Sequence, residues 1–81
     1  MIIIYTQDKT IIHKNADCAK RDILDLYGEK LGQEAYCVVR GGLIGASYRK
    51  YGGPLVVVVS KEEAERIQAK ELSIEMKNSN Y

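Results

Sequence analysis

The chain has 81 residues, of which 46% are apolar and 28% are charged, and its formal net charge at pH 7 is +1. This balance predicts one small globular domain and argues against a general nucleic-acid coat protein. The longest apolar runs, such as Leu55–Val59, are far shorter than the roughly 20 residues that cross a bilayer. Met1–Tyr5 has no basic segment before its apolar residues, so we expect no secretory signal, no membrane partner and a reducing, cytoplasmic location.

The first half of the chain is expected to form one or two strands and then a helix. Met1–Thr6 is β-branched and continuously apolar, as is typical of a strand covered on both faces. After a polar break, Thr10–Lys14 can add a second short strand by hairpin. Asn15 or Asp17 can then cap a helix that runs to about Gly32, because its apolar residues recur at helical spacing.

Two further strands are expected in the middle of the chain. Ala35–Arg40 is short and apolar and is predicted to be a strand. Leu55–Val59 contains four consecutive valines, which favours a strand buried on both faces.

The last third is expected to hold a helix and a final strand. Ser60 and Glu63 have the spacing of a capping box, so a helix should begin there and end near Lys70. Apolar and polar residues alternate over Glu71–Lys77, which predicts a half-exposed strand at the edge of a sheet. Residues 78–81 are predicted to be a flexible tail.

The resulting order of strand, helix, strand, strand, helix and strand predicts an α+β fold. It is the order of a ferredoxin-like split β-α-β sandwich (βαββαβ), formed by a single domain over residues 1–77. In this architecture an antiparallel sheet carries two helices on one face, and the two continuously apolar strands are central. An alternative has an extra N-terminal hairpin strand over residues 10–14.

The segment Arg40–Pro54 is the most distinctive part of the sequence. It holds five of the seven glycines and the only proline. Ala35–Lys61 contains four basic residues and no acidic residue, so the remainder of the chain has a net charge of −3. A basic loop between two stiff strands favours contact with an anion or a partner protein. The candidate binding residues in this loop over residues 40–53 are Arg40, Gly41, Gly42, Gly45, Tyr48, Arg49, Lys50 and Tyr51.

Each residue type in this loop suits a different part of binding. Glycines permit positive φ and let backbone amides approach an anion, arginine and lysine supply charge, and tyrosines supply contact area. Neither GxGxxG nor a GK[ST] ending is present, so no known phosphate loop is matched. In the structural alternative, residues 43–50 extend the sheet as a long β-hairpin and residues 52–54 form its turn.

The sequence predicts no catalytic residues, no metal and no cofactor. Cys18 and Cys37 are expected to be free thiols, and no CxxC pair is present to bind a soft metal ion. His13 is the only histidine and is expected at the surface or in a hairpin. It can activate Cys18 only with a third, orienting group, which the sequence does not indicate.

The position of the loop resembles that of the loop in PII-type signalling proteins, which also lies between the second and third strands of a ferredoxin-like domain. The shared features are the glycines, Tyr48-Arg49 and the apolar strand that follows. This chain is shorter than that family, and the family's C-terminal nucleotide-binding segment has no counterpart in it. The resemblance assigns no family.

The function expected from these observations is that of a small, non-enzymatic binding or regulatory module. It would contact an anionic small molecule or a protein partner through the basic loop, and it would form a homo-oligomer, most simply a dimer. One alternative is local nucleic-acid binding through the same loop, and another is a protein-binding inhibitor or effector from a mobile element. An enzyme dependent on Cys18 or Cys37 is a further alternative.

Overall fold

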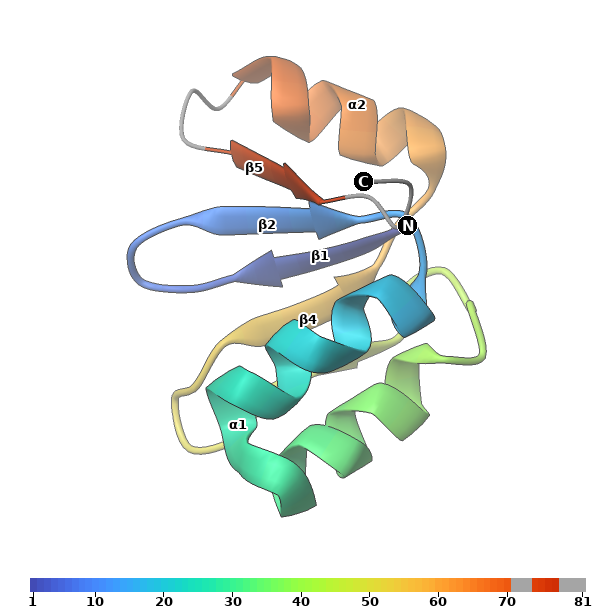
Figure 1. Ribbon diagram of the computed structural model, residues 1–81. Coiled ribbons are helices and arrows are strands. Elements are labelled where there is room, and N and C mark those ends of the chain that lie inside the picture. Colours follow the sequence, from blue (N-terminus) through green and yellow to red (C-terminus); the bar gives the residue numbers. More distant parts are fainter. Residues whose placement is uncertain (71–73, 78–81) are drawn as a thin grey trace.

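Isoleucine and valine build a five-stranded sheet with β1 at its centre (Figure 1). The strand order is β3-β4-β1-β2-β5, and every pair is antiparallel except β2 and β5, which are parallel. The computed structural model describes residues 1–70 and the backbone of residues 74–77, so the tail predicted over residues 78–81 lies outside the described residues. The strands are β1 (Ile2–Tyr5), β2 (Thr10–His13), β3 (Ser47–Tyr48), β4 (Leu55–Val58) and β5 (Ile74–Lys77).

The N-terminal hairpin confirms the alternative with an extra strand. β1 pairs with β2 so that Ile3 lies opposite Ile12. Thr6 closes the turn: its amide donates to the carbonyl of Lys9 at 2.9 Å, and its hydroxyl accepts from the amide of Lys9 at 3.0 Å. These hydrogen bonds supply partners for backbone groups of the turn that have none in the β-sheet.

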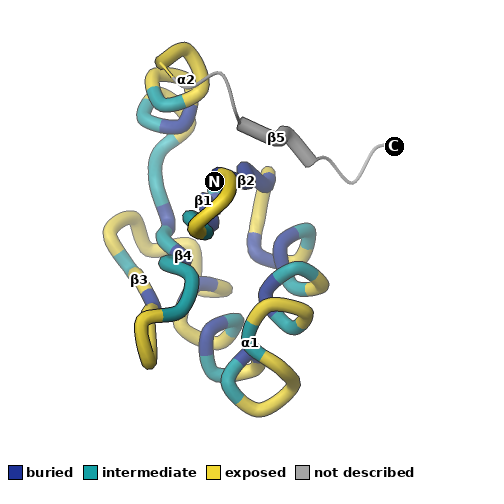
Figure 2. Tube along the Cα trace, turned by 90° about the vertical axis from the view of Figure 1, so that its left-hand side faces the viewer, coloured by how far each residue is buried: buried dark blue, intermediate teal, exposed yellow. Residues whose placement is uncertain are grey.

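Alternate residues of the central strands point to two separate cores. Ile2 and Ile4 pack with the residues of α1 (Ala16–Val39) on one face of the sheet. Ile3 packs with Ala64 of α2 (Lys61–Lys70) on the other face. The two helices therefore lie on opposite faces (Figures 1 and 2), and the prediction that both lie on one face is wrong.

The two helices reach opposite faces through different kinds of connection. β2, β4 and β5 run parallel to one another, since β1 is antiparallel to both β2 and β4. The connection through α1 leads from β2 to β3, which is antiparallel to β4 and hence to β2, whereas the connection through α2 joins the parallel strands β4 and β5. The preference for right-handed crossovers therefore applies to the α2 connection, and α1 covers the other face of the sheet.

α1 is folded back on itself at Gly28. This glycine has φ 83° and ψ 171°, a conformation that almost only glycine adopts. The two halves, residues 16–27 and 29–39, then pack against each other (Figure 1). Their closest approach is at Gly32, where an added Cβ would lie 2.7 Å from Leu24 Cδ2 and 2.8 Å from Leu24 Cα. Glycines therefore provide both the reversal and the close contact of this helical hairpin.

The predicted strand at Ala35–Arg40 is wrong, because α1 continues to Val39 and Arg40 is its C-cap. Gly32, Ala35 and Val39 are buried, and this spacing of three and four residues is helical. A short apolar run does not distinguish a buried strand from a buried helix, and packing of residues 29–39 on the sheet decides the outcome here.

The predicted end of the first helix near Gly32 is wrong, because α1 continues to Val39, whereas the starts of both helices and the strand at Leu55–Val59 agree with the structure. Asn15 caps α1, β4 has the buried alternate residues Val56 and Val58, and α2 begins after Ser60 and ends at Lys70. β5 lies at the edge of the sheet, although residues 71–73 of the predicted strand are outside the described residues. The α+β class is confirmed. The observed order is ββαββαβ, so the ferredoxin-like order is not confirmed.

Replacement of Gly28 by alanine is expected to lower the free energy of unfolding by about 1–3 kcal/mol, because a side chain strains this backbone conformation. An added Cβ at Gly28 meets no atom within 4 Å, so the loss would be conformational and not steric. Urea denaturation measures the change. The control is Gly41→Ala, since Gly41 also has free space but not a positive φ. Equal stability of the two variants would contradict this account of the reversal.

Candidate functional site

The predicted loop is divided by β3 into two parts at opposite ends of a strand. Residues 40–46 connect α1 to β3, whereas residues 49–54 form the turn between β3 and β4. Only Ser47 and Tyr48 extend the sheet. Gly45 (φ 97°) and Ala46 both bond to Val58 of β4, so a β-bulge leads into the edge strand.

The turn between β3 and β4 is fixed by Tyr27 of α1. The Tyr27 hydroxyl donates to the carbonyl of Pro54 at 2.5 Å and accepts from the amide of Lys50 at 3.2 Å. Its ring meets the Tyr48 ring edge-on, with the centroids 5.3 Å apart. An added Cβ at Gly53 would lie 2.9 Å from Tyr27 Cε1, so glycine is needed at that position.

Two of the predicted binding residues are used within the protein. Tyr48 is buried, and burial raises the pKa of its hydroxyl. Lys50 Nζ donates to Glu34 Oε1 at 2.8 Å; this hydrogen bond lowers the pKa of Glu34 and raises the pKa of Lys50. The pair is charged at neutral pH, so the Lys50 charge is already balanced by an acidic neighbour.

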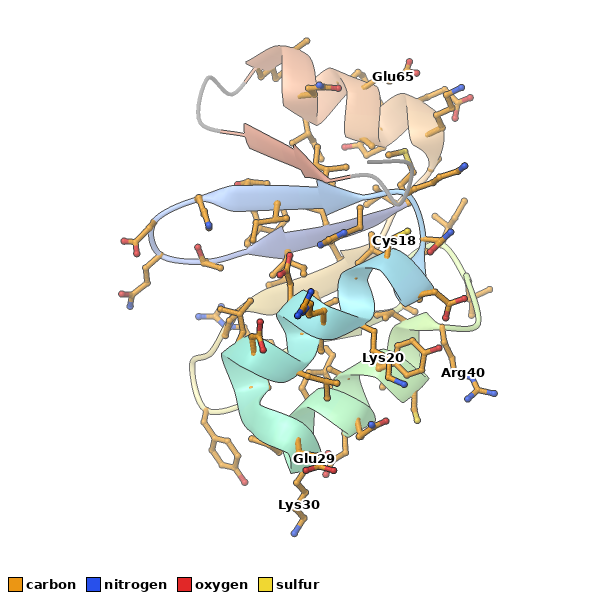
Figure 3. All side chains as sticks on the ribbon, viewed as in Figure 1. Cys18, Lys20, Glu29, Lys30, Arg40 and Glu65 are labelled. Carbon is orange, nitrogen blue, oxygen red and sulfur yellow. The ribbon has the colours of Figure 1, made fainter. Side chains whose placement is uncertain are left out.

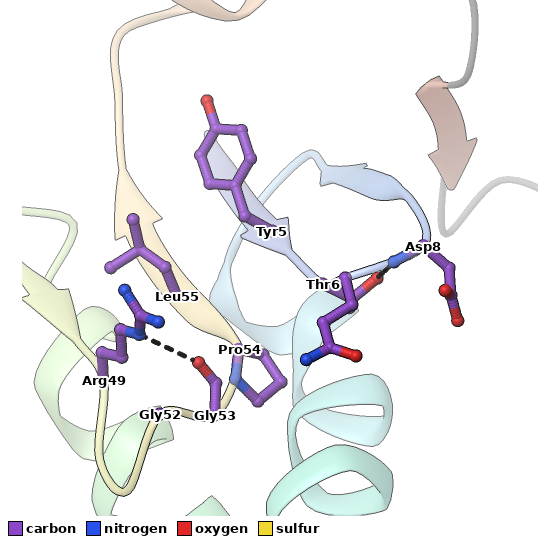
Figure 4. A pocket seen from close by; sticks show the side chains of 9 residues that line it. Tyr5, Thr6, Asp8, Arg49, Gly52, Gly53, Pro54 and Leu55 are labelled. Atoms are coloured by element: carbon purple, nitrogen blue, oxygen red, sulfur yellow. Dashed lines mark hydrogen bonds between the residues drawn. The ribbon is translucent and has the colours of Figure 1, made fainter.

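A cavity of about 560 Å³ lies beside this turn, between the two hairpins (Figure 4). Arg49 is its basic residue, and its Nε donates to the carbonyl of Gly53 at 3.2 Å. Asp8 lines the same cavity from the turn between β1 and β2. An anion in this cavity would meet one arginine and one carboxylate, which gives it little net attraction.

A second cavity, of about 460 Å³, lies at the other end of the sheet. We call it the crevice. Lys14, Asn15 and Ala16 line it where β2 leads into α1, and Ser60, Lys61 and Glu62 line it where β4 leads into α2. Arg40, Gly42 and Ile44 contribute the part of the predicted loop that adjoins it.

The crevice lies at the end of the sheet where β2 and β4 finish and both helices begin. β2 and β4 are parallel, and α1 and α2 leave them for opposite faces. β1 lies between them and runs the other way, so the crevice opens between the starts of the two helices.

Both helices begin at the crevice with free backbone amides. Asn15 Oδ1 accepts from the amide of Cys18 at 2.9 Å, and Ser60 Oγ accepts from the amide of Glu63 at 3.1 Å. These caps leave the first two amides of each helix without a hydrogen-bond partner among the described residues. Free amides and the positive ends of two helix dipoles therefore meet at one cavity.

Three basic side chains border the crevice. Lys14, Arg40 and Lys61 are exposed, and none of them has an ion-pair partner within the described part of the chain. Arg40 extends from the end of α1 into solvent (Figure 3). Glu62 also lines the crevice, so the four side chains together have a charge of +2. Only Arg40 of the three belonged to the predicted site; Lys14 and Lys61 are far from it in sequence.

His13 lies in the hairpin of β1 and β2, which is one of the two predicted places, but it is buried beneath α1 and not at the surface. It is 3% exposed, and its Nε2 lies 2.9 Å from Oδ2 of Asp22. Its Nδ1 is buried without a hydrogen-bond partner among the described residues. Cys18 is half-buried and Cys37 is exposed, and the partner of His13 is a carboxylate and not a thiol. The pair fixes β2 to α1.

No family model, curated protein or solved structure matches this chain. The resemblance to the PII loop depends on a strand at Ala35–Arg40, and the helix found there removes that basis. Among residues 1–70, no three histidine, cysteine or acidic residues are grouped to hold a metal ion. None of the helices described here has a stretch both long and apolar enough to cross a membrane.

Substitution of Asp22 by alanine is expected to lower the free energy of unfolding by about 1–3 kcal/mol, because a buried histidine nitrogen loses its acceptor. Chemical denaturation at pH 7 tests this, with Asp25→Ala as the control, since Asp25 is an exposed carboxylate on the same helix. Equal effects of the two substitutions would show that the contact between His13 and Asp22 does not stabilise the protein.

Proposed function

We propose that this protein is a non-enzymatic binding module that holds an anionic ligand in the crevice. The observation that carries the proposal is the convergence of two helix N-termini and three basic side chains on one cavity. The elements that bring them together are far apart in sequence, so the arrangement is a property of the fold.

Electrostatics favours an anion at this place for two independent reasons. Each helix N-terminus stabilises a negative charge by roughly 0.3–1 kcal/mol. Hydrogen bonds between an anion and a charged donor contribute about 1.5–3 kcal/mol each. Lys14, just before α1, and Lys61, at the start of α2, supply such donors, and Arg40 supplies a planar group that can bind two oxygens. A dianion such as a phosphate group fits this set best.

The proposal retains one half of the predicted loop. Arg40, Gly41, Gly42 and Gly45 belong to the segment beside the crevice, whereas Arg49, Lys50 and Tyr51 belong to the distant turn. The anionic group can be carried by a small molecule or by a protein partner. Homodimer formation also stays a prediction.

Replacement of Lys61 by alanine is expected to weaken the binding of inorganic phosphate roughly tenfold, which corresponds to the loss of about 1.4 kcal/mol. Arg40→Ala should have a similar effect. Isothermal titration calorimetry at low salt measures both. The matched control is Arg49→Ala, which removes the same charge at the other end of the sheet. If Arg49→Ala weakens binding as much as Lys61→Ala, the crevice is not the site.

One observation favours local nucleic-acid binding as a second candidate function. Tyr51 is 89% exposed in the turn between β3 and β4, two residues after Arg49 in the sequence. A solvent-exposed ring in a turn that also contains an arginine suits stacking on a single-stranded base.

For this candidate, Tyr51→Ala should reduce the affinity for a single-stranded oligonucleotide several-fold, since stacking contributes about 1–3 kcal/mol per base. Fluorescence anisotropy over a range of salt concentrations measures it. Tyr51→Phe keeps the ring and should bind normally. Oligonucleotide binding that is lost in Lys61→Ala but kept in Tyr51→Ala would refute the turn as the contact.

A further inference from the structure

The loop that borders the crevice presents two adjacent apolar side chains to solvent. Leu43 is 75% exposed and Ile44 is 66% exposed. Single exposed apolar residues are common on protein surfaces, but an adjacent pair at the rim of a cavity indicates a contact. Ile44 lines the crevice together with Arg40 and Gly42. A ligand in the crevice would therefore contact both apolar and basic side chains.

The walls of the crevice are also apolar. Ile2, Val39 and Val58 line it, and each of them belongs to the core beneath α1. The cavity volume of about 460 Å³ lies within the range of roughly 300–1,000 Å³ that is usual for pockets that bind organic ligands. Ile2, Val39 and Val58 are almost fully buried, whereas Ile44 is largely exposed, so a bare phosphate ion would leave the Ile44 side chain in contact with water.

The backbone of the loop supports the exposed pair in a defined turn. The amide of Ala46 donates to the carbonyl of Leu43 at 3.0 Å, and Gly42 and Gly45 have φ of 71° and 97°. A Cβ at either glycine would meet no atom within 4 Å, so there is open space on both sides of the turn. Leu43 and Ile44 are thus held at the rim with room for a ligand beside them.

We propose that the ligand of the crevice is an organic phosphate monoester with an apolar or aromatic body. This inference rests on the proposed anion-binding function and specifies its ligand. The phosphate group would lie at the starts of α1 and α2, within reach of Lys14 and Lys61. The organic body would lie along the apolar wall beneath Ile44.

Three probes test the proposal by calorimetry at about pH 8.5, where all of them are dianions: inorganic phosphate, phenyl phosphate and hexyl phosphate. The apolar body would bury a few tens of square ångströms of surface, so the two esters are expected to bind about tenfold more tightly than phosphate. Ile44→Ser should remove this advantage and leave phosphate binding unchanged. Lys61→Ala should weaken all three. The control is Leu26→Ser, an exposed leucine of α1 that does not line the crevice.

The outcomes separate this inference from the function on which it rests. Equal affinities for phosphate and both esters would overturn the proposed ligand class but keep the anion site. Failure of all three to bind would overturn both. Vesicles of neutral and anionic lipid distinguish a surface from a small ligand: vesicle binding that needs Leu43 and Ile44, without ester binding, would overturn the proposal in favour of a membrane surface.

Discussion

The reversal of α1 at Gly28 is the constraint on which the rest of the structure depends. A straight helix of this length would run past the sheet, whereas the reversal brings its end back beside its start. Val39 then completes the core above β1, and Arg40 reaches the same end of the sheet as Asn15. One side of the crevice is therefore formed by the loop that follows the second half of α1.

Four of the five strands (β1, β2, β4 and β5), the start of each helix and the α+β class could be predicted from local sequence pattern. β-branched runs, a capping asparagine and a capping serine each act within a few residues of the element they define. The helical nature of Ala35–Arg40 could not be predicted, because it follows from packing of residues 29–39 on the sheet. The spacing of Gly28 and Gly32 was the available signal for a reversal followed by a close helix contact.

The candidate site was predicted only in part for a related reason. Charge counted along the chain assigned Arg40, Arg49 and Lys50 to one loop, but a two-residue strand separates them, and Glu34 of α1 neutralises Lys50. Lys14 and Lys61 are brought to Arg40 by the order of strands, which no local pattern reveals. Within the described residues, the chain thus concentrates positive charge without ion-pair partners where two helices begin, although its net charge is close to zero.

The central claim is that an anion is held by the starts of both helices. A nitrogen-15 NMR titration with inorganic phosphate tests it most directly, because each backbone amide reports on its own surroundings. The account predicts that the amide resonances of Ala16, Asp17, Lys61 and Glu62 shift together with one dissociation constant, while those of Gly52 and Gly53 stay in place. Shifts confined to the turn between β3 and β4, or to one helix alone, would contradict it.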